Sequence, residues 1–180
     1  VVLPDADLAA AVKGTVSACM LNSGQTCSAH TRLLVHESQY EAAKPLIAQA
    51  IQKLNIGPSL DEGSRLGPLV SANQRDRVVA MIEKGLAEGG ELIVGGPERP
   101  ALPKGYFVQP TAMRVQPQHT LAREEIFGPV LVVLTYKDED DAIRIANSTA
   151  YGLGGGVWSA DEDRAMAVAR KLRTGQVDIN

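Results

Sequence analysis

This chain of 180 residues has few cysteines, no long hydrophobic run and no excess of basic charge. Two cysteines cannot form a disulfide framework, so we expect reduced thiols and a cytoplasmic protein. The longest aliphatic run, residues 130–134, is far shorter than the ~20 residues that a membrane-spanning helix needs. The net charge of −3 provides no basic surface, so neither nucleic acid nor an anionic membrane is an expected partner.

A signal-peptide pattern and an initiator methionine are also missing, and the chain opens on an apolar stretch. We therefore expect a piece of a longer protein. The composition, with 44% hydrophobic and 22% charged residues, is that of an ordinary globular domain. A domain of this length can bury a sizeable core without disulfides or metals.

Apolar residues recur at helical spacing in several segments, and short β-type runs separate them. Helices are predicted over residues 7–21, 40–54, about 78–86, 138–147 and 161–173. Strands are predicted over residues 31–36, 92–94, 130–136, 157–158 and 176–179, with extended pieces in 105–115. Ser159 and Glu162 have the spacing of a capping box before the last helix. Helices alternating with short strands indicate an α/β domain around a largely parallel sheet.

Cys27 is the first candidate for chemistry, because it follows a predicted helix and precedes a predicted strand. A loop at such a junction can present a side chain to a cleft. A cysteine thiolate is a strong nucleophile and its acyl thioester hydrolyses readily. Gly24 would let the backbone fold closely around the sulfur. On spacing alone, Cys27 also fits a small buried hydrophobic residue, and that alternative stays open.

The other cysteine and the histidines raise weaker possibilities. Cys19 lies on the apolar face of its predicted helix, so we expect it in the core. Cys27 and His30 could belong to a metal site or to a cysteine–histidine dyad. A zinc site needs about four ligands, and the only other histidines are His36 and His119. We therefore expect no metal in this chain.

The second candidate is the segment 123–130, Arg-Glu-Glu-Ile-Phe-Gly-Pro-Val. Two adjacent carboxylates precede an aromatic residue and a Gly-Pro turn that leads into a buried strand. Glu125 beside Phe127 could hold the hydroxyl groups and the flat ring of a ligand. A solvated charge pair at the start of a strand is the alternative, and the residues alone leave both open. Gly128 permits the close approach of another group.

A third segment, residues 150–158, is rich in glycine. Gly152 and Gly154–Gly156 resemble a phosphate-binding loop only superficially, because no Lys-Ser/Thr follows and the run leads into a strand instead of opening a helix. We interpret it as a turn or as tight packing where two backbones touch.

These three segments, in this order, resemble the aldehyde dehydrogenase superfamily. The matching motifs are Gly24-Gln-Thr-Cys27, Leu66-Gly-Pro-Leu-Val70, Pro110-Thr111, Glu124-Glu-Ile-Phe-Gly-Pro-Val130, Asn147-Ser-Thr-Ala-Tyr-Gly-Leu153 and Arg173-Thr-Gly-Gln-Val-Asp-Ile-Asn180. The resemblance covers essentially the whole chain. It implies the catalytic domain of that family over residues 1–180, a three-layer α/β domain with a largely parallel open sheet flanked by helices. The dinucleotide-binding lobe and the C-terminal tail would lie outside this chain.

The resemblance also implies a reaction, the oxidation of an aldehyde to a carboxylic acid with NAD or NADP. Cys27 would attack the aldehyde carbon to form a thiohemiacetal, and its backbone N–H and an asparagine side chain would hold the oxyanion. Hydride would leave to NAD(P)⁺, and water would hydrolyse the resulting thioester. Glu125 matches the glutamate that binds the nicotinamide ribose, and Phe127 matches the aromatic residue near the nicotinamide. Gln74 falls where a weaker ribose contact is expected.

No residue of this chain matches the family's general-base glutamate or its oxyanion asparagine, which lie further upstream. We therefore expect the chain by itself to oxidise no aldehyde. The resemblance further implies that the whole protein is a homo-oligomer, a dimer or a tetramer. Three alternatives stay open: a truncated binding or oligomerising module, a relative that passes the thioester to coenzyme A, and a cysteine hydrolase if a histidine reaches Cys27. Neither the particular aldehyde nor the choice between NAD and NADP follows from these residues.

Overall fold

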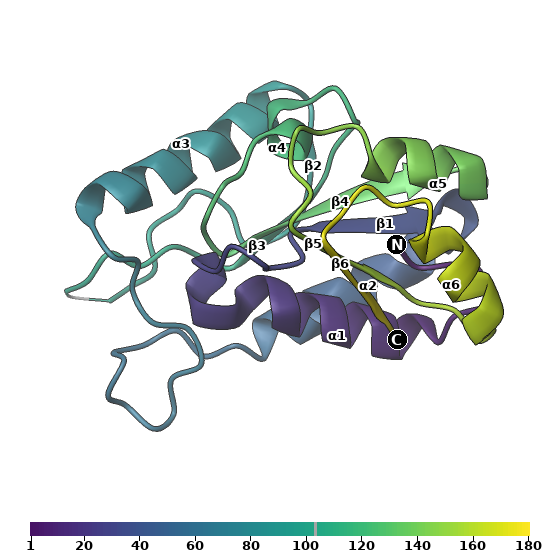
Figure 1. The fold of residues 1–180 in the computed structure, drawn as a ribbon. Helices are drawn as coiled ribbons and strands as arrows, with labels where there is room; N and C mark the ends of the chain where they lie inside the picture. Colours follow the sequence, from purple (N-terminus) through teal and green to yellow (C-terminus); the bar gives the residue numbers. More distant parts are fainter. Residues whose placement is uncertain (103) are drawn as a thin grey trace.

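The structure is a computed structural model that describes residues 1–102 and 104–180. The described residues form six helices and six strands (Figure 1). They are α1 (Leu8–Met20), β1 (Arg32–His36), α2 (Tyr40–Gln52), α3 (Ala72–Ala87), β2 (Glu91–Val94), β3 (Thr111–Arg114), α4 (Thr120–Arg123), β4 (Val130–Tyr136), α5 (Glu139–Ala146), β5 (Gly154–Val157), α6 (Glu162–Ala169) and β6 (Gln176–Ile179). Two short 3₁₀ turns, Leu21–Gly24 and Glu37–Gln39, follow α1 and β1.

Four strands form the main sheet in the order β1-β4-β3-β2, in which only β2 is antiparallel to its neighbour. The strands β5 and β6 form a second, parallel pair. Val2 lies between the two sheets and makes parallel bridges to both Val35 and Trp158. Its N–H donates to the carbonyl of Leu34 at 2.9 Å, and the N–H of Leu3 donates to the carbonyl of Trp158 at 2.9 Å. The first residues of the chain therefore join the two sheets.

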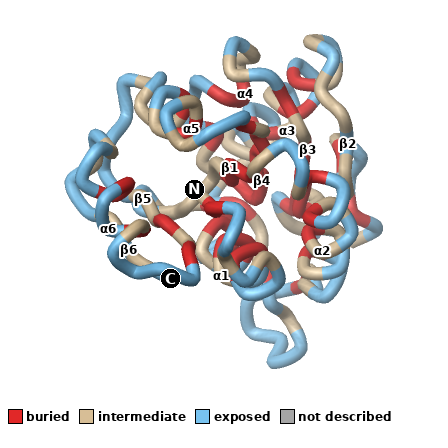
Figure 2. Tube along the Cα trace, turned by 90° about the vertical axis from the view of Figure 1, so that its right-hand side faces the viewer, coloured by how far each residue is buried: buried red, intermediate tan, exposed pale blue. Residues whose placement is uncertain are grey.

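Helices cover both faces of the main sheet (Figure 1). The helices α1 and α2 pack on one face, and α3, α4 and α5 pack on the other. Because successive residues of a strand point to opposite faces, β4 contributes to both cores: Leu131 and Val133 face α1 and α2, whereas Val132 and Leu134 face the other helices. Buried residues accordingly gather along β1, β3 and β4, in the middle of the molecule (Figure 2). The predicted three-layer α/β fold is confirmed.

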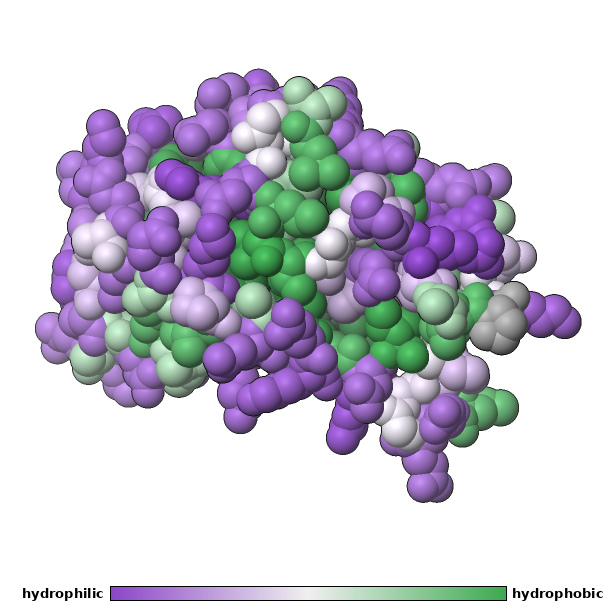
Figure 3. Space-filling model, turned by 180° about the vertical axis from the view of Figure 1, so that it is seen from behind, coloured by the Kyte–Doolittle hydropathy of each residue, from purple (hydrophilic) through white to green (hydrophobic). Residues whose placement is uncertain are grey.

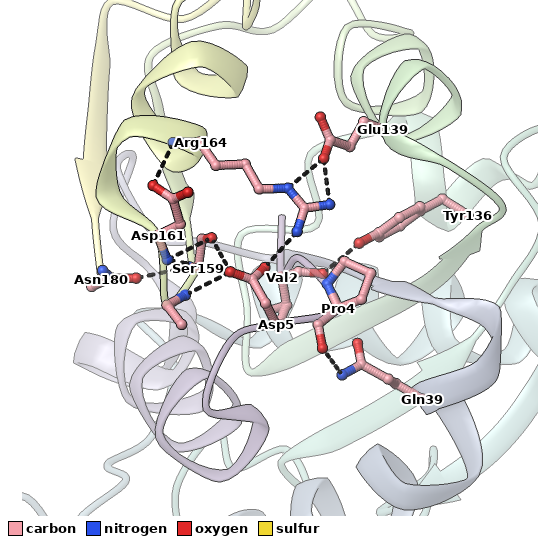
Figure 4. A network of polar contacts seen from close by, with 11 residues as sticks. Val2, Pro4, Asp5, Gln39, Tyr136, Glu139, Ser159, Asp161, Arg164 and Asn180 are labelled. Atoms are coloured by element: carbon pink, nitrogen blue, oxygen red, sulfur yellow. Dashed lines mark hydrogen bonds and ion pairs between the residues drawn. The ribbon is translucent and has the colours of Figure 1, made fainter.

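A polar network ties α6 to the start of the chain and to α5 (Figure 4). The Asp5 carboxylate accepts hydrogen bonds from the Ser159 hydroxyl at 2.6 Å and from the Asp161 N–H at 3.2 Å. Arg164 donates to Asp5 at 3.0 Å and pairs with Glu139 of α5 at 2.5 Å. The hydrogen bond from Ser159 is the main reason that the pKa of Asp5 lies below its ordinary value.

The predicted capping box before α6 is wrong. Asp161 is the N-cap residue, and its side chain accepts the N–H of Arg164 at 3.1 Å. A capping box would need the Ser159 N–H for the Glu162 carboxylate, but that N–H donates to the side-chain oxygen of Asn180 at 2.9 Å. The Ser159 hydroxyl donates to the Asp5 carboxylate, and its oxygen accepts from the Asp161 N–H at 3.2 Å. The helix also ends at Ala169, earlier than the periodicity predicts.

The glycine-rich segment differs only in part from its prediction, because the close contact of two backbones is present at Gly152, where a Cβ atom would lie 2.5 Å from the carbonyl oxygen of Arg173. Gly154, Gly155 and Gly156 are themselves the first residues of β5, whereas Trp158 lies beyond that strand and makes an isolated bridge. Two close neighbours explain the small residues. A Cβ atom on Gly156 would lie 3.3 Å from Cε1 of His30, and one on Gly155 would lie 3.4 Å from the Thr174 side chain.

Cys19 lies in the core, as predicted. It is fully buried on α1, and its thiol donates to the carbonyl of Val130 at 3.5 Å. Burial raises the pKa of the Cys19 thiol to about 12, so this cysteine stays protonated near neutral pH.

Candidate functional site

Cys27 follows a turn of unusual backbone conformation at the end of α1. Asn22, Ser23 and Gly24 have φ values of 51°, 56° and 75°, so three successive residues adopt left-handed geometry. This conformation is free of steric cost only for glycine. Cys27 itself is exposed and free, which contradicts the alternative of a buried hydrophobic residue. Strained backbone of this kind is often found at functional sites.

The second predicted segment forms a turn between α4 and β4. Glu125 is exposed, Phe127 is half-buried, and Phe127 has a φ of 58°. Two side chains of α3 donate to backbone carbonyls of this turn. Arg77 reaches Glu125 and Ile126, each at 2.6 Å, and Gln74 reaches Phe127 at 2.8 Å. The turn is therefore held from the side of α3.

A third segment contacts the same turn from the other side. The backbone N–H of Glu125 donates to the hydroxyl of Tyr151 at 3.3 Å. Both hydrogen bonds that Glu125 makes to described residues use its backbone, so its exposed carboxylate is available to a ligand. The predicted ligand-binding segment is thus a fixed turn with a carboxylate at its surface.

The cysteine loop (residues 21–27) and the glutamate turn (residues 124–129) pack directly on each other. A Cβ atom on Gly24 would lie 2.0 Å from the carbonyl oxygen of Gly128, and one on Gly128 would lie 2.6 Å from Cγ2 of Val78 on α3. Only glycine allows such close approach of two backbones. The sequence prediction of a close approach at Gly128 is confirmed. The neighbour of Gly24, however, is the glutamate turn and not the sulfur of Cys27.

A cavity of about 390 Å³ contains three of the four predicted site residues. Cys27, Glu125 and Phe127 line it together with Tyr151. Gln74 does not line the cavity, because its amide nitrogen donates to the carbonyls behind the turn. Its role as a ribose contact stays a prediction. The volume lies within the range of small-molecule sites.

The cavity is also lined by a cationic side chain, that of Arg32, and by a titratable one, that of His30. Arg32 donates to the carbonyls of Ile145 and Ala146 at the end of α5, at 2.8 and 3.3 Å, and its Nε has no partner among the described residues. Burial lowers the pKa of Arg32, although a guanidinium keeps its charge at neutral pH. Burial also lowers the pKa of His30, an effect that the Asp178 carboxylate partly opposes.

Sequence reasoning missed the residues that hold these loops. Arg77 lies one helical turn after Gln74, so the two side chains share a face of α3, and that spacing was the available signal. Tyr151 belongs to the motif Asn147-Ser-Thr-Ala-Tyr-Gly-Leu153, whose residues alone suggest no role for it. Gln25 lies inside the cysteine motif Gly24–Cys27, and Ser23 directly precedes it.

Among residues 1–102 and 104–180, no three His, Cys, Asp or Glu side chains are grouped so that they could hold a metal ion. In the same part of the chain, no helix is long and apolar enough to cross a membrane.

The site defines a class of protein: an α/β domain that presents an exposed cysteine and a fixed carboxylate–aromatic turn to one cavity. A family model described as "Aldehyde dehydrogenase family" matches residues 1–180. The chain belongs to that family.

Individual relatives agree with this assignment. The chain is 44% identical over 181 residues to geranial dehydrogenase from Castellaniella defragrans, matching 100% of this chain and 37% of that protein. It is also similar to the crystal structure of a mutant of aldehyde dehydrogenase C from Pseudomonas syringae in complex with NAD⁺ and octanal. There the TM-score is 0.97 at 41% identity, covering 99% of this chain and 37% of that chain.

An aldehyde dehydrogenase from Mycobacterium tuberculosis in complex with NAD⁺ gives a TM-score of 0.96, at 41% identity over 99% of this chain and 37% of that chain. The chain thus spans less than two fifths of the length of the relatives that it matches.

Proposed function

We propose that this chain is the catalytic-domain portion of an NAD(P)-dependent aldehyde dehydrogenase, with Cys27 as its nucleophile. One observation carries the proposal: Cys27 and the turn that carries Glu125 and Phe127 come from two distant segments of the chain and line one cavity. Membership of the family and the NAD⁺ complexes of similar proteins support it. In this proposal the dinucleotide-binding lobe belongs to a part of the protein outside residues 1–180.

The residues of the glutamate turn fit a nicotinamide cofactor. The carboxylate of Glu125 is exposed and can accept hydrogen bonds from ribose hydroxyls, while the ring of Phe127 offers a flat apolar face beside it. Gln74 would retain its side-chain oxygen for a ribose hydroxyl, since its amide nitrogen is engaged. When bound, NAD(P)⁺ supplies the hydride acceptor of the reaction.

Cys27 performs the covalent step in this mechanism. Its sulfur attacks the aldehyde carbon, and the backbone N–H of Cys27 donates to the oxyanion that forms. A fixed donor at that position lowers such a barrier by about 3 kcal/mol. After hydride loss, the thiol carries the acyl group as a thioester, which is a good substrate for hydrolysis by water. The general base and the oxyanion asparagine lie in the remainder of the protein.

The first test is acylation of the 180-residue chain by p-nitrophenyl acetate, measured by intact mass and peptide mapping. This reaction needs the nucleophile and part of the oxyanion hole but no cofactor. We expect a single acetyl group on Cys27, no modification of Cys19, and little turnover. The Cys27→Ala variant should not be acylated. If no selective acylation occurs, the binding or oligomerising module becomes the better interpretation.

Aldehyde oxidation by the chain itself is the second test. With NAD⁺ and octanal we expect no steady production of NADH, because hydride acceptor binding and deacylation both need the missing part. A sustained rise in NADH from the purified chain would contradict this. Addition of coenzyme A to the acylated chain distinguishes the acylating alternative, which would release acetyl-coenzyme A.

The whole protein is a homo-oligomer, a dimer or a tetramer, in this proposal. Several large apolar side chains are exposed, among them Leu21, Leu60 and Val70. Seen from behind, apolar side chains form a band across the middle of the molecule between hydrophilic margins (Figure 3). Contiguous apolar surface favours association. A monomeric, salt-insensitive profile in size-exclusion chromatography would count against self-association.

A further inference from the structure

We infer that Ser23 and Gln25 are positioning residues for Cys27 and that they act through the segment 66–70. This inference rests on the proposed function, in which Cys27 is the nucleophile. The sequence motifs alone give no reason to distinguish these two residues from their neighbours. Their side-chain hydrogen bonds in the structure provide that reason.

The cysteine loop needs an external support because its backbone is strained. Asn22 and Ser23 adopt left-handed φ values of 51° and 56°, which cost free energy for residues other than glycine. Such a conformation persists only where the surrounding structure over-determines it. Cys27 follows a few residues later, so the direction of its side chain depends on whether the turn keeps this geometry.

Two side-chain hydrogen bonds attach the turn to one distant segment. The Ser23 hydroxyl donates to the carbonyl of Gly67 at 2.9 Å, and the Val70 N–H donates to the side-chain oxygen of Gln25 at 3.0 Å. Ser23 is 4% exposed, so its bond is shielded from water. The two bonds lie on either side of Gly24, which itself presses on Gly128.

The turn is also closed internally. The side chain of Asn22 donates to the carbonyl of Gln25 at 3.1 Å, and the amide nitrogen of Gln25 lies 3.4 Å from the carbonyl of Asn22. The Thr26 hydroxyl donates to the carbonyl of Leu21 at 3.2 Å. These local bonds shape the turn, whereas among the described residues only the contacts of Ser23 and Gln25 relate it to the rest of the domain through hydrogen bonds.

The segment 66–70 is a suitable anchor because it is itself fixed. Leu66 and Leu69 are each 3% exposed. The N–H of Leu69 donates to the carbonyl of Tyr106 at 2.9 Å, and the carbonyl of Leu66 accepts from the N–H of Gly57 at 3.0 Å. The motif Leu66-Gly-Pro-Leu-Val70 thereby gains a role, as the support of the cysteine loop.

The test distinguishes an effect on the position of the Cys27 thiol from an effect on its general reactivity. Acyl transfer from p-nitrophenyl acetate requires an aligned sulfur and the Cys27 N–H as an oxyanion donor. Alkylation by iodoacetamide requires only an accessible thiolate. The ratio of the two second-order rate constants at Cys27, measured by mass spectrometry on the 180-residue chain, therefore reports positioning. A change in overall stability alone would leave that ratio unchanged.

The variants are Gln25→Met, which removes both bonds of that side chain at constant length, and Ser23→Ala. Gln25→Glu keeps the acceptor for the Val70 N–H and serves as the conservative rescue. Gln39→Met is the matched control, because Gln39 donates to the Pro4 carbonyl at 3.1 Å, outside the cysteine loop. Unfolding midpoints and the near-ultraviolet signal of Trp158 verify folding in each variant.

We expect the ratio to fall about five- to tenfold in Gln25→Met and in Ser23→Ala, the size of one lost hydrogen bond. Gln25→Glu should lose less than Gln25→Met, and Gln39→Met should match the wild type. An unchanged ratio in a folded Gln25→Met or Ser23→Ala variant would overturn the inference. If Gln25→Met does not fold, Ser23→Ala decides it by the same criterion. Absence of selective acylation in the wild type would instead contradict the proposed function.

Discussion

Gly24 and Gly128 lie in backbone contact, although they are more than a hundred residues apart in the sequence. A Cβ atom on Gly24 would stand 2.0 Å from the carbonyl oxygen of Gly128. This contact places the cysteine loop on the glutamate turn, which in turn presses on Val78 of α3. The position of the candidate nucleophile Cys27 relative to the candidate cofactor ligand Glu125 therefore depends on glycine, which has no side chain, at both positions.

Substitution of Gly24 by Ala should lower the free energy of unfolding by about 2–4 kcal/mol, from overpacking together with left-handed strain. Urea unfolding measures this. Gly89→Ala is the matched control, because Gly89 has a φ of 89° but no atom within 4 Å of the added Cβ. Its loss should be limited to about 1–2 kcal/mol from strain alone. Equal losses in the two variants would show that the contact with Gly128 carries no energy.

The two cysteines should differ sharply in reactivity. Cys27 is exposed, whereas Cys19 is fully buried and burial raises its pKa to about 12. We expect iodoacetamide at neutral pH to modify Cys27 in the native chain and to modify Cys19 only when the chain unfolds. Alkylation across a urea gradient, followed by peptide mapping, measures this. Modification of both cysteines at similar rates in the native state would contradict the core position of Cys19.

Asp5 should make the stability depend on pH in the acidic range. Its pKa in the folded chain lies below the ordinary value of 3.8, first because of the Ser159 hydroxyl, so the unfolded chain binds a proton more readily. The stabilisation is therefore fully present above that ordinary value and is lost as the pH falls through the folded pKa.

Urea unfolding between pH 2 and pH 7 tests this prediction. Asp5→Asn should be less stable than the wild type at neutral pH, and the difference should shrink in acid. Ser159→Ala should lose part of the acid dependence, because it removes the largest cause of the pKa shift. A difference between wild type and Asp5→Asn that stays constant with pH would refute the network as its source.

Arg77 should restrain the glutamate turn through its two bonds to the carbonyls of Glu125 and Ile126. In Arg77→Met, we expect amide hydrogen exchange in residues 124–130 to accelerate about tenfold. Arg75→Met is the control on the same helix, because Arg75 pairs with its neighbour Asp76 and lies over the Tyr106 ring. Exchange in this segment that accelerates equally in both variants would argue against a specific restraint.

Tyr136 should stabilise the junction between the two sheets. Its hydroxyl donates to the carbonyl of Val2 at 2.6 Å in a buried environment (Figure 4). Tyr136→Phe leaves that carbonyl without this donor, and we expect a loss of about 1–3 kcal/mol in the free energy of unfolding. Tyr106→Phe, on an exposed ring, should change it by less than about 0.5 kcal/mol.

Local patterns predicted most helices and strands because buried positions are apolar and recur with the period of the helix or strand. The continuous apolar run 130–136 matches β4 residue for residue, since this strand is buried on both faces. The core position of Cys19 follows from the same periodicity along α1. The short helix α4 was missed, because four residues carry too little periodicity to be recognised.

The cap of α6 shows where local patterns fail. Glu162 lies three residues after Ser159, but the side-chain oxygen of Asn180, 21 residues distant, accepts the Ser159 N–H that a capping box would use. Likewise, the glycine run is a strand because it pairs in parallel with β6, whose residues follow it by more than 20 positions in the sequence. A pattern read over about ten residues cannot reveal hydrogen-bond or strand partners that lie further away in the sequence.

The sequence by itself determined the α/β class, the elements with strong periodicity, and which residues are candidates for chemistry. Only the tertiary structure decided how these candidates are arranged. It placed Cys27, Glu125 and Phe127 at one cavity, set Gln74 behind the turn, and revealed Arg77 and Tyr151 as its supports. The physical reason is that periodicity encodes burial, which is a property of single residues, whereas a site depends on contacts between residues far apart in the chain.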